Sequence, residues 1–262
     1  MINREQTFTR RDCLWLIIPL IIFLLFFGII FLCHLNQSLF YSLNRYTRVI
    51  PWFWEHATLL GDALVLPCLF VVLIRKRPDL VWALLWSAIV ATLLVHSLKP
   101  ILQIPRPAGV LDRDSFTIIG KALKRRSFPS GHTATVFTAA SILILTFKNS
   151  GIRASLLLIA SLVGLSRIMV GAHWPLDVFA GAAAGLIGGL LGTGLSHRIN
   201  GGNTRTFQIL FGCLLLMASA FLTAFYHSGY PGAIWFQRAT GIFCLVYGGR
   251  EYGLLLRSPK GS

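Results

Sequence analysis

The chain has 262 residues, of which 55% are hydrophobic and 13% are charged, and its mean hydropathy is +0.70. This composition excludes an ordinary soluble domain and is typical of a polytopic membrane protein. The formal net charge is +15 at pH 7, but the basic residues are scattered in short segments between apolar runs, so we do not expect the chain to bind nucleic acid. The five cysteines have no paired or metal-type spacing and are interpreted as packing residues.

The first apolar run covers residues 14–35 and follows a polar segment that contains Arg4, Arg10 and Arg11. The run is long enough to cross a bilayer. Its end, FGIIFLCHLNQ, offers no good signal-peptidase site, so we expect this first span to be retained. The aromatic-rich segment that follows suits a membrane interface, where a short amphipathic helix is expected.

Seven further apolar runs follow, so the sequence predicts an all-α polytopic membrane bundle of about eight transmembrane helices. They lie at about residues 57–74, 80–98, 133–147, up to 170, 176–195, 207–226 and 233–247. The run at 176–195 is rich in Gly and Ala, which allow close helix contact. No long linker or repeat divides the chain, and we predict a single membrane domain over residues 1–262, with an additional C-terminal helical pair at about 207–247.

Short basic segments predict the orientation of these spans, because cytoplasmic loops carry an excess of Lys and Arg. One side collects Arg4, Arg10, Arg11, Arg75, Lys76, Arg77, Lys148, Arg153, Arg198, Arg205, Arg250, Arg257 and Lys260. We predict that this side is cytoplasmic. The longer connection at 99–128 lies on the other side and is also basic, but its cations can serve substrate binding rather than topology.

Three polar segments on that opposite side contain side chains that could carry chemistry. The segments are KPILQIPRP, FPSGH and SRIMVGAHWPLD, and the side chains are Lys99, Arg106, Ser130, Gly131, His132, Arg167, His173 and Asp177. FPSGH stands where an apolar helix begins, and the free N–H groups of a helix start can bind phosphate. Each segment alone also has a structural interpretation: a capped turn, snorkelling cations or an interfacial ion pair. Their occurrence together favours a functional site.

The three segments resemble the signature of the type 2 phosphatidic acid phosphatase superfamily, written K-x6-R-P, P-S-G-H and S-R-x5-H-x3-D. Every fixed position matches, over residues 99–177. The resemblance implies a membrane-embedded phosphatase domain with a six-helix core, here at about 57–197, and two added spans. It further implies a metal-independent enzyme without a cofactor.

The resemblance also implies residue roles. His173 would be the nucleophile that forms a phosphohistidine, Asp177 would orient its ring, and His132 would act as the general acid. The spacing agrees, because residues four apart share one helix face and Asp177 can hold one ring nitrogen while the other attacks. The residues expected to bind the phosphoryl group are Lys99, Arg106, Ser130, Gly131 and Arg167.

The predicted function is hydrolysis of a phosphate or diphosphate monoester of a lipid at the outer leaflet of a bacterial inner membrane. Undecaprenyl diphosphate, phosphatidic acid, phosphatidylglycerophosphate and lipid A are the substrates that the resemblance suggests. The expected partners are the lipid phosphate and membrane lipids. A lipid phosphotransferase with the same intermediate and a non-catalytic lipid-phosphate transporter remain alternatives.

Two features lie outside the signature. Asp62 follows Gly61 inside an apolar run, where an acid is expected either to pair with a signature cation or to cap a half-helix. The basic cluster of Lys121, Lys124, Arg125 and Arg126 is interpreted as a solvated loop face in preference to a site for anionic lipid head groups.

Overall fold

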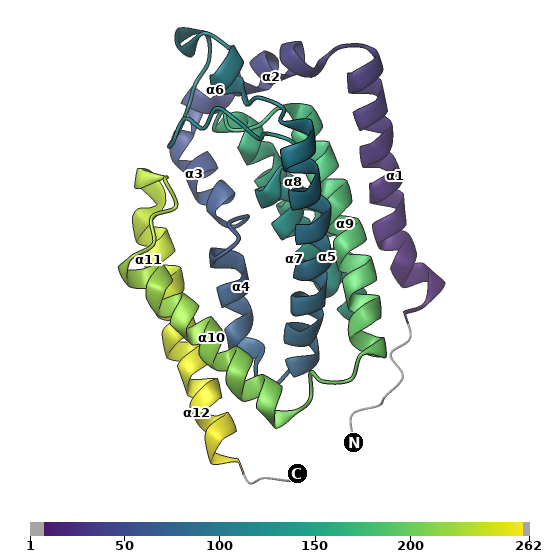
Figure 1. The fold of residues 1–262 in the computed structure, drawn as a ribbon, viewed down its shortest axis with the longest axis vertical. Helices are drawn as coiled ribbons and strands as arrows, with labels where there is room; N and C mark the ends of the chain where they lie inside the picture. Colours follow the sequence, from purple (N-terminus) through teal and green to yellow (C-terminus); the bar gives the residue numbers. More distant parts are fainter. Residues whose placement is uncertain (1–7, 259–262) are drawn as a thin grey trace.

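The computed structural model describes residues 8–258, which form helices and no strand (Figure 1). The prediction of an all-α bundle is therefore confirmed. The α-helices are α1 (Arg10–Leu32), α2 (Asn36–Asn44), α3 (Pro51–Leu59), α4 (Val65–Leu69), α5 (Pro78–Leu102), α6 (Pro107–Val110), α7 (Gly131–Thr146), α8 (Ser150–Met169), α9 (Pro175–Arg198), α10 (Arg205–Ala224), α11 (Ile234–Phe243) and α12 (Gly249–Arg257).

Several of these helices can cross a membrane, and the chain is a multi-pass membrane protein. Within residues 8–258, five segments are long and apolar enough: Arg10–Leu32, Pro78–Val110, Ser150–Met169, Pro175–Arg198 and Arg205–Ala224. Helix α7 is apolar but has only 16 residues. The short amphipathic segment after the first span is also helical, as α2.

The two other predicted spans are broken into shorter pieces. The run at 57–74 contains the end of α3, a turn at Gly61 and Asp62, helix α4, and the 3-10 helix Phe70–Leu73. The turn breaks the helix because the Asp62 carboxylate takes the backbone N–H groups at the start of α4. The run predicted at 233–247 consists of α11, the π-helix Cys244–Gly248 and α12. It therefore continues past residue 247, to the end of α12.

Helix α9 lies in the middle of the bundle, where it packs against α5, α7 and α1 (Figure 1). Its glycines permit this approach. A Cβ atom at Gly185 would lie 2.5 Å from the carbonyl oxygen of Ala134, and one at Gly192 would overlap the backbone of Ser87. The close helix contact predicted from the small residues is present. Helices α10 and α11 pack against α4, on the side away from α9.

The first turn of α1 and the last turn of α12 lie at the same end of the molecule, and α6 lies at the opposite end (Figure 1). Buried carboxylates at the first end bind basic residues of the short turns. Asp12 binds Lys148 at 2.7 Å and also Arg153, while Glu251 binds Arg75 at 2.7 Å. Part of the positive charge that predicts the cytoplasmic side therefore also ties neighbouring helices together.

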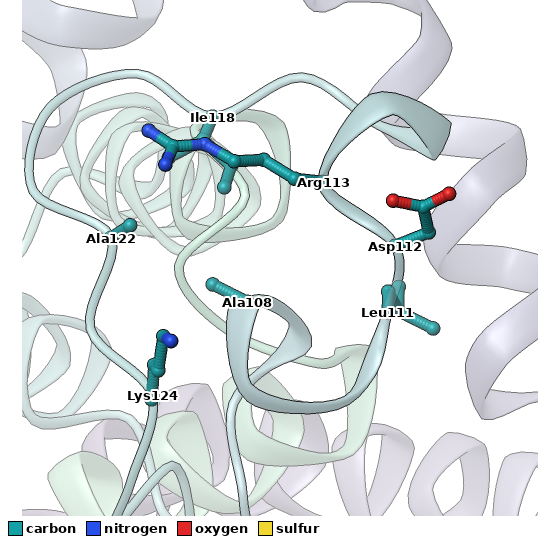
Figure 2. Close-up of a pocket in the computed structure, with 7 residues that line it drawn as sticks. All are labelled: Ala108, Leu111, Asp112, Arg113, Ile118, Ala122 and Lys124. Atoms are coloured by element: carbon teal, nitrogen blue, oxygen red, sulfur yellow. The ribbon is translucent and has the colours of Figure 1, made fainter.

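The connection between α5 and α7 folds over the opposite end. It contains α6 and encloses a small pocket of about 280 Å³, lined by Ala108, Leu111, Asp112, Arg113, Ile118, Ala122 and Lys124 (Figure 2). The side chains of the predicted basic cluster in this connection are exposed. The backbone carbonyls of Arg125 and Arg126 in this cluster accept hydrogen bonds from the side chains of Arg106 and Lys99.

Candidate active site

The three motifs meet at the end of the bundle that carries this connection. Helix α5 supplies Lys99, α7 supplies Gly131 and His132, and α8 supplies Arg167, while Arg106 and His173 come from connections. All six line one cavity of about 340 Å³. Two other predicted site residues, Ser130 and Asp177, are buried beside it.

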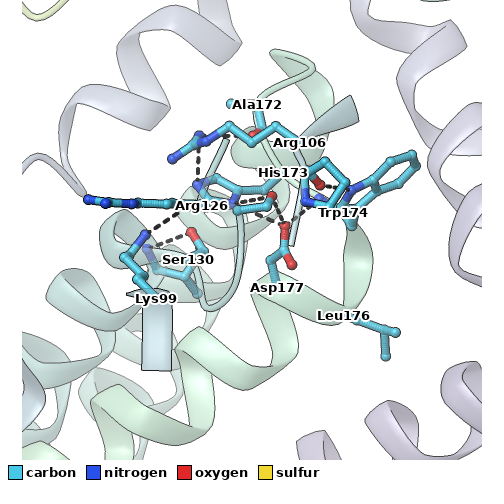
Figure 3. Close-up of polar contacts among 12 residues, drawn as sticks. Lys99, Arg106, Arg126, Ser130, Ala172, His173, Trp174, Leu176 and Asp177 are labelled. Atoms are coloured by element: carbon cyan, nitrogen blue, oxygen red, sulfur yellow. Dashed lines mark hydrogen bonds and ion pairs between the residues drawn. The ribbon is translucent and has the colours of Figure 1, made fainter. Parts of the chain in front are cut away.

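His173 and Asp177 form a buried pair (Figure 3). Nδ1 of His173 lies 3.1 Å from Oδ2 of Asp177. The same carboxylate oxygen accepts a hydrogen bond of 2.9 Å from the Trp174 backbone N–H, because Asp177 occupies the third position of α9 and caps that helix. The helix start thus fixes the carboxylate, which in turn favours a proton on Nδ1 and leaves Nε2 free of one.

A third residue, Ser127, contacts both members of this pair, and it is not among the site residues predicted from the sequence. Its hydroxyl donates to Oδ2 of Asp177 and lies 3.3 Å from Nδ1 of His173. Ser127 is 50 residues from Asp177, so no helical spacing relates them. Its place directly before FPSGH was the one available signal.

The guanidinium of Arg106 faces the other ring nitrogen. Nη1 of Arg106 lies 3.2 Å from Nε2 of His173 and donates to the Ala172 carbonyl at 3.0 Å, while Nε donates to the Arg125 carbonyl at 3.1 Å. Burial, together with Arg106, Arg167 and Lys99, holds the pKa of His173 well below its ordinary value. The ring is therefore neutral at pH 7 and has a lone pair on Nε2.

The other two cations are also held by oxygen atoms. Nζ of Lys99 donates to the Arg126 carbonyl at 3.3 Å. Nη1 of Arg167 donates to the hydroxyls of Thr58 and Tyr230, the latter at 2.6 Å. Nε of Arg167 is buried and has no hydrogen-bond partner within the described part of the chain. A buried donor of this kind fits an anionic ligand.

The residues of the FPSGH segment do not all face the cavity. The Ser130 hydroxyl caps α7 by accepting from the Thr133 N–H, and the Ser130 N–H donates to the Asp177 carbonyl at 2.9 Å. Both donor and acceptor groups of Ser130 thus hold the scaffold, and the residue does not line the cavity. Gly131 does line it, and a Cβ atom there would meet nothing within 4 Å. At the start of α7, the cavity is therefore open next to Gly131.

His132 also lines the cavity, and its Nε2 lies 3.9 Å from Oδ2 of Asp62. Asp62 accepts hydrogen bonds from the backbone N–H groups of Leu64 at 2.8 Å and Val65 at 3.2 Å. Of the two roles expected for Asp62, the structure shows the capping of a half-helix. It adds a neighbour, His132, that was not anticipated.

The cavity changes character along its length. Beyond the cations, its lining comes from α4, α5 and α7 and is mostly apolar, with Leu66, Leu84, Ala88, Ala91 and Val95 among the residues. A cationic end that joins an apolar lining suits an amphiphilic ligand with an anionic head. Across residues 8–258, no three His, Cys, Asp or Glu side chains form a group that could hold a metal ion.

Comparisons with known proteins agree with the motif resemblance. Residues 80–200 match the PAP2 superfamily. The lipid A 1-phosphatase of Porphyromonas gingivalis is 41% identical over 75 residues, which are 28% of this chain and 17% of that protein. The Escherichia coli protein YbjG, for which undecaprenyl-diphosphatase activity is itself a proposal, is 29% identical over 161 residues, 59% of this chain and 79% of YbjG.

A solved structure is similar over nearly its whole length. The crystal structure of Aquifex aeolicus LpxE has 38% sequence identity and a TM-score of 0.53, and the match covers 60% of this chain and 94% of that one. Since the three motifs also come together in space as the signature requires, the chain belongs to the PAP2 superfamily.

Proposed function

We propose that this protein is an integral-membrane lipid phosphatase, a hydrolase of the phosphate or diphosphate ester of a lipid. The observation that carries the proposal is the position of His173 Nε2, which lies 3.2 Å from Nη1 of Arg106 in a cavity with a cationic end and a mostly apolar lining. The cations fit a phosphoryl group and the apolar lining fits a hydrocarbon chain. The lipid A 1-phosphatase among the relatives supports the same chemistry.

The reaction proceeds in two steps. In the first, Nε2 of His173 attacks phosphorus in line, the bond from phosphorus to the leaving oxygen breaks, and His132 gives that oxygen a proton. The hydrogen bond from Nδ1 to Asp177 stabilises the charge that the ring gains. In the second step, His132 takes a proton from water, whose oxygen attacks phosphorus and releases inorganic phosphate from His173.

The cations stabilise the phosphoryl oxygens without a metal. Nη1 of Arg106 is 3.2 Å from the attacking nitrogen, so it can bind an oxygen of the group being transferred. The free Nε of Arg167 offers a second donor, and Lys99 lines the same end of the cavity. Fixed donors of this kind act where charge develops in the transition state.

The site lies at the end of the bundle opposite the first turn of α1 and the last turn of α12. The basic short segments favour a cytoplasmic position for that first end, so the active site faces the outer leaflet of a bacterial inner membrane. Undecaprenyl diphosphate and lipid A are the first substrates to try, followed by phosphatidic acid and phosphatidylglycerophosphate.

The test is phosphate release by the full chain, purified in detergent, from each of these four lipids, with and without EDTA. We expect release from at least one lipid, unchanged by EDTA, and none from the matched variant His173→Ala. Activity lost in EDTA and restored by a divalent ion would contradict the metal-free mechanism. Binding without release would favour a transporter, and phosphate transfer to a second lipid would favour a phosphotransferase.

A further inference from the structure

The connection between α10 and α11 reaches the active site from outside the segment that matches the family, residues 80–200. It contributes two tyrosines. The hydroxyl of Tyr226 donates to Oδ2 of Asp62 at 2.7 Å. The hydroxyl of Tyr230 accepts from Nη1 of Arg167 at 2.6 Å. The added C-terminal pair therefore contacts the site on two sides.

The connection is held in place by the buried side chain of Gln237. Its Nε2 donates to the carbonyl groups of Leu222 at 3.1 Å and Tyr226 at 2.7 Å, and its Oε1 accepts from the Ser228 N–H at 3.1 Å. The other side of the connection packs on the loop that carries the first motif, since a Cβ atom at Gly120 would overlap the Gly229 carbonyl. These contacts hold in place the connection that contains Tyr226 and Tyr230.

Asp62 links Tyr226 to His132. Its Oδ1 caps α4, while its Oδ2 accepts from Tyr226 and lies 3.9 Å from Nε2 of His132. The turn itself packs directly on the start of α7, because a Cβ atom at Gly61 would lie 2.9 Å from the His132 carbonyl oxygen. The hydrogen bonds to both oxygens hold the carboxylate in place beside the imidazole.

His132 needs such a carboxylate for the role proposed above. A general acid must carry its proton until the leaving oxygen needs it. Lys99, Arg106 and Arg167 line the same cavity end and repel that proton. A carboxylate within 4 Å attracts it. Tyr226 keeps the carboxylate oriented toward the ring.

Tyr230 acts on Arg167 in a different way. Its hydroxyl fixes one guanidinium nitrogen, and the centre of its ring lies 5.8 Å from the guanidinium carbon. The hydroxyl adds no negative charge, so Arg167 keeps its full attraction for phosphate. Fixing Nη1 also leaves Nε free to bind an oxygen of the ligand.

We propose that Asp62, Tyr226 and Tyr230 are positioning residues of the reaction, so that the C-terminal helical pair completes the active site. Asp62 and Tyr226 act through His132, and Tyr230 acts through Arg167. This inference rests on the proposed function and adds to it.

The first test uses two substrates with different leaving groups. Tyr226→Phe and Asp62→Asn each lower kcat/KM on an alkyl lipid phosphate by about tenfold or more, as expected for a lost hydrogen bond to a charged group. On a nitrophenyl phosphate, whose leaving group needs no proton, the loss is less than about threefold. Asparagine can still cap α4, so the fold is retained. Equal losses on both substrates would overturn the role of this pair.

The second test uses inhibition by vanadate, a mimic of phosphate. Tyr230→Phe keeps the ring but removes the hydroxyl, so it raises both KM and the vanadate inhibition constant by about tenfold. Both substrates are affected alike, because phosphate binding precedes departure of the leaving group. An inhibition constant equal to that of the wild type would overturn the role of Tyr230.

Tyr252→Phe is the matched control. The Tyr252 hydroxyl donates to the Ile209 carbonyl at 3.1 Å within the same C-terminal pair, and Tyr252 does not line the cavity. Its loss weakens the packing of the pair without changing the substrate ratio or vanadate inhibition. The same changes in this control would overturn the inference. A wild type that releases no phosphate would instead contradict the proposed function, which separates the two failures.

Discussion

Ser127 donates its hydroxyl hydrogen to the same oxygen of Asp177 that holds His173. Oδ2 of Asp177 thus receives hydrogen bonds from a hydroxyl, a backbone N–H and an imidazole. Such outer contacts hold a catalytic group in the productive orientation.

Ser127→Ala removes one of the bonds that hold the carboxylate. We expect kcat to fall by about tenfold with little change in KM, because the orientation of the attacking ring is disturbed while the cations remain. Steady-state kinetics on a lipid phosphate measures both. Ser155→Ala is the matched control, since its exposed hydroxyl bonds only within α8. A wild-type kcat for Ser127→Ala would show that the serine is not needed.

The two histidines are predicted to fail differently. His173→Ala loses the nucleophile, so no substrate restores turnover and no phosphoenzyme is trapped after rapid acid-free quenching. His132→Ala loses the acid, so it is severely impaired on alkyl phosphates and partly rescued by a nitrophenyl phosphate. The assignment would be reversed by two results together: phosphoenzyme is trapped in His173→Ala, and His132→Ala loses equal activity on both substrates.

The pH dependence follows from the environment of His173. Its pKa in the folded protein is well below its ordinary value of 6.5, so the ring remains a competent nucleophile as the pH falls through 6.5. The acid limb of kcat/KM that belongs to this ring therefore lies below 6.5. A profile of kcat/KM against pH measures it, and an acid limb above 6.5 that moves in the Ser127→Ala variant would contradict the prediction.

The same shift has a consequence for stability. The unfolded chain takes up a proton on His173 below 6.5, whereas the folded chain resists it. The stability that the neutral ring contributes is thus fully present above pH 6.5, and it is lost as the pH falls from 6.5 toward the lower pKa of the folded state. We expect the unfolding temperature of His173→Asn to depend less on pH below 6.5 than that of the wild type.

Sidedness is tested with single cysteines in a background without the five native ones. Asp112 lines the pocket in the connection between α5 and α7 (Figure 2), and Asn200 lies in the turn between α9 and α10. Both are exposed. In intact cells, an impermeant thiol reagent should label Asp112→Cys and not Asn200→Cys. The reverse pattern would place the active site in the cytoplasm.

Hydropathy predicted where the helices lie but not where they break. The run at 57–74 is apolar apart from Thr58 and Asp62, and its break depends on the hydrogen bonds that the Asp62 carboxylate accepts from the start of α4. These bonds also place Asp62 beside His132. A window average of hydropathy contains no information on such local bonds.

Motif spacing predicted most of the residues that line the site, but not the residues that hold them in place. The pairing of His173 with Asp177 follows from a separation of four residues. Thr58, in α3, and Tyr230, in the connection between α10 and α11, reach Arg167 from positions far apart in the chain, and no periodicity relates them. Ser130 is the opposite case: its type and position suit phosphate, while its backbone N–H and its hydroxyl oxygen make hydrogen bonds within the scaffold, and its role in phosphate binding stays a prediction. The division of the chain into domains stays a prediction.

The continuity between the cationic and apolar linings of the cavity has a consequence for the products. The proposed hydrolysis would separate an amphiphile into a soluble anion and a lipid with a smaller head. The anion is held by the cations that bound it as part of the substrate, so inorganic phosphate competes with fresh substrate. The lipid is held by its chain, so turnover depends on the length of that chain as well as on its head group.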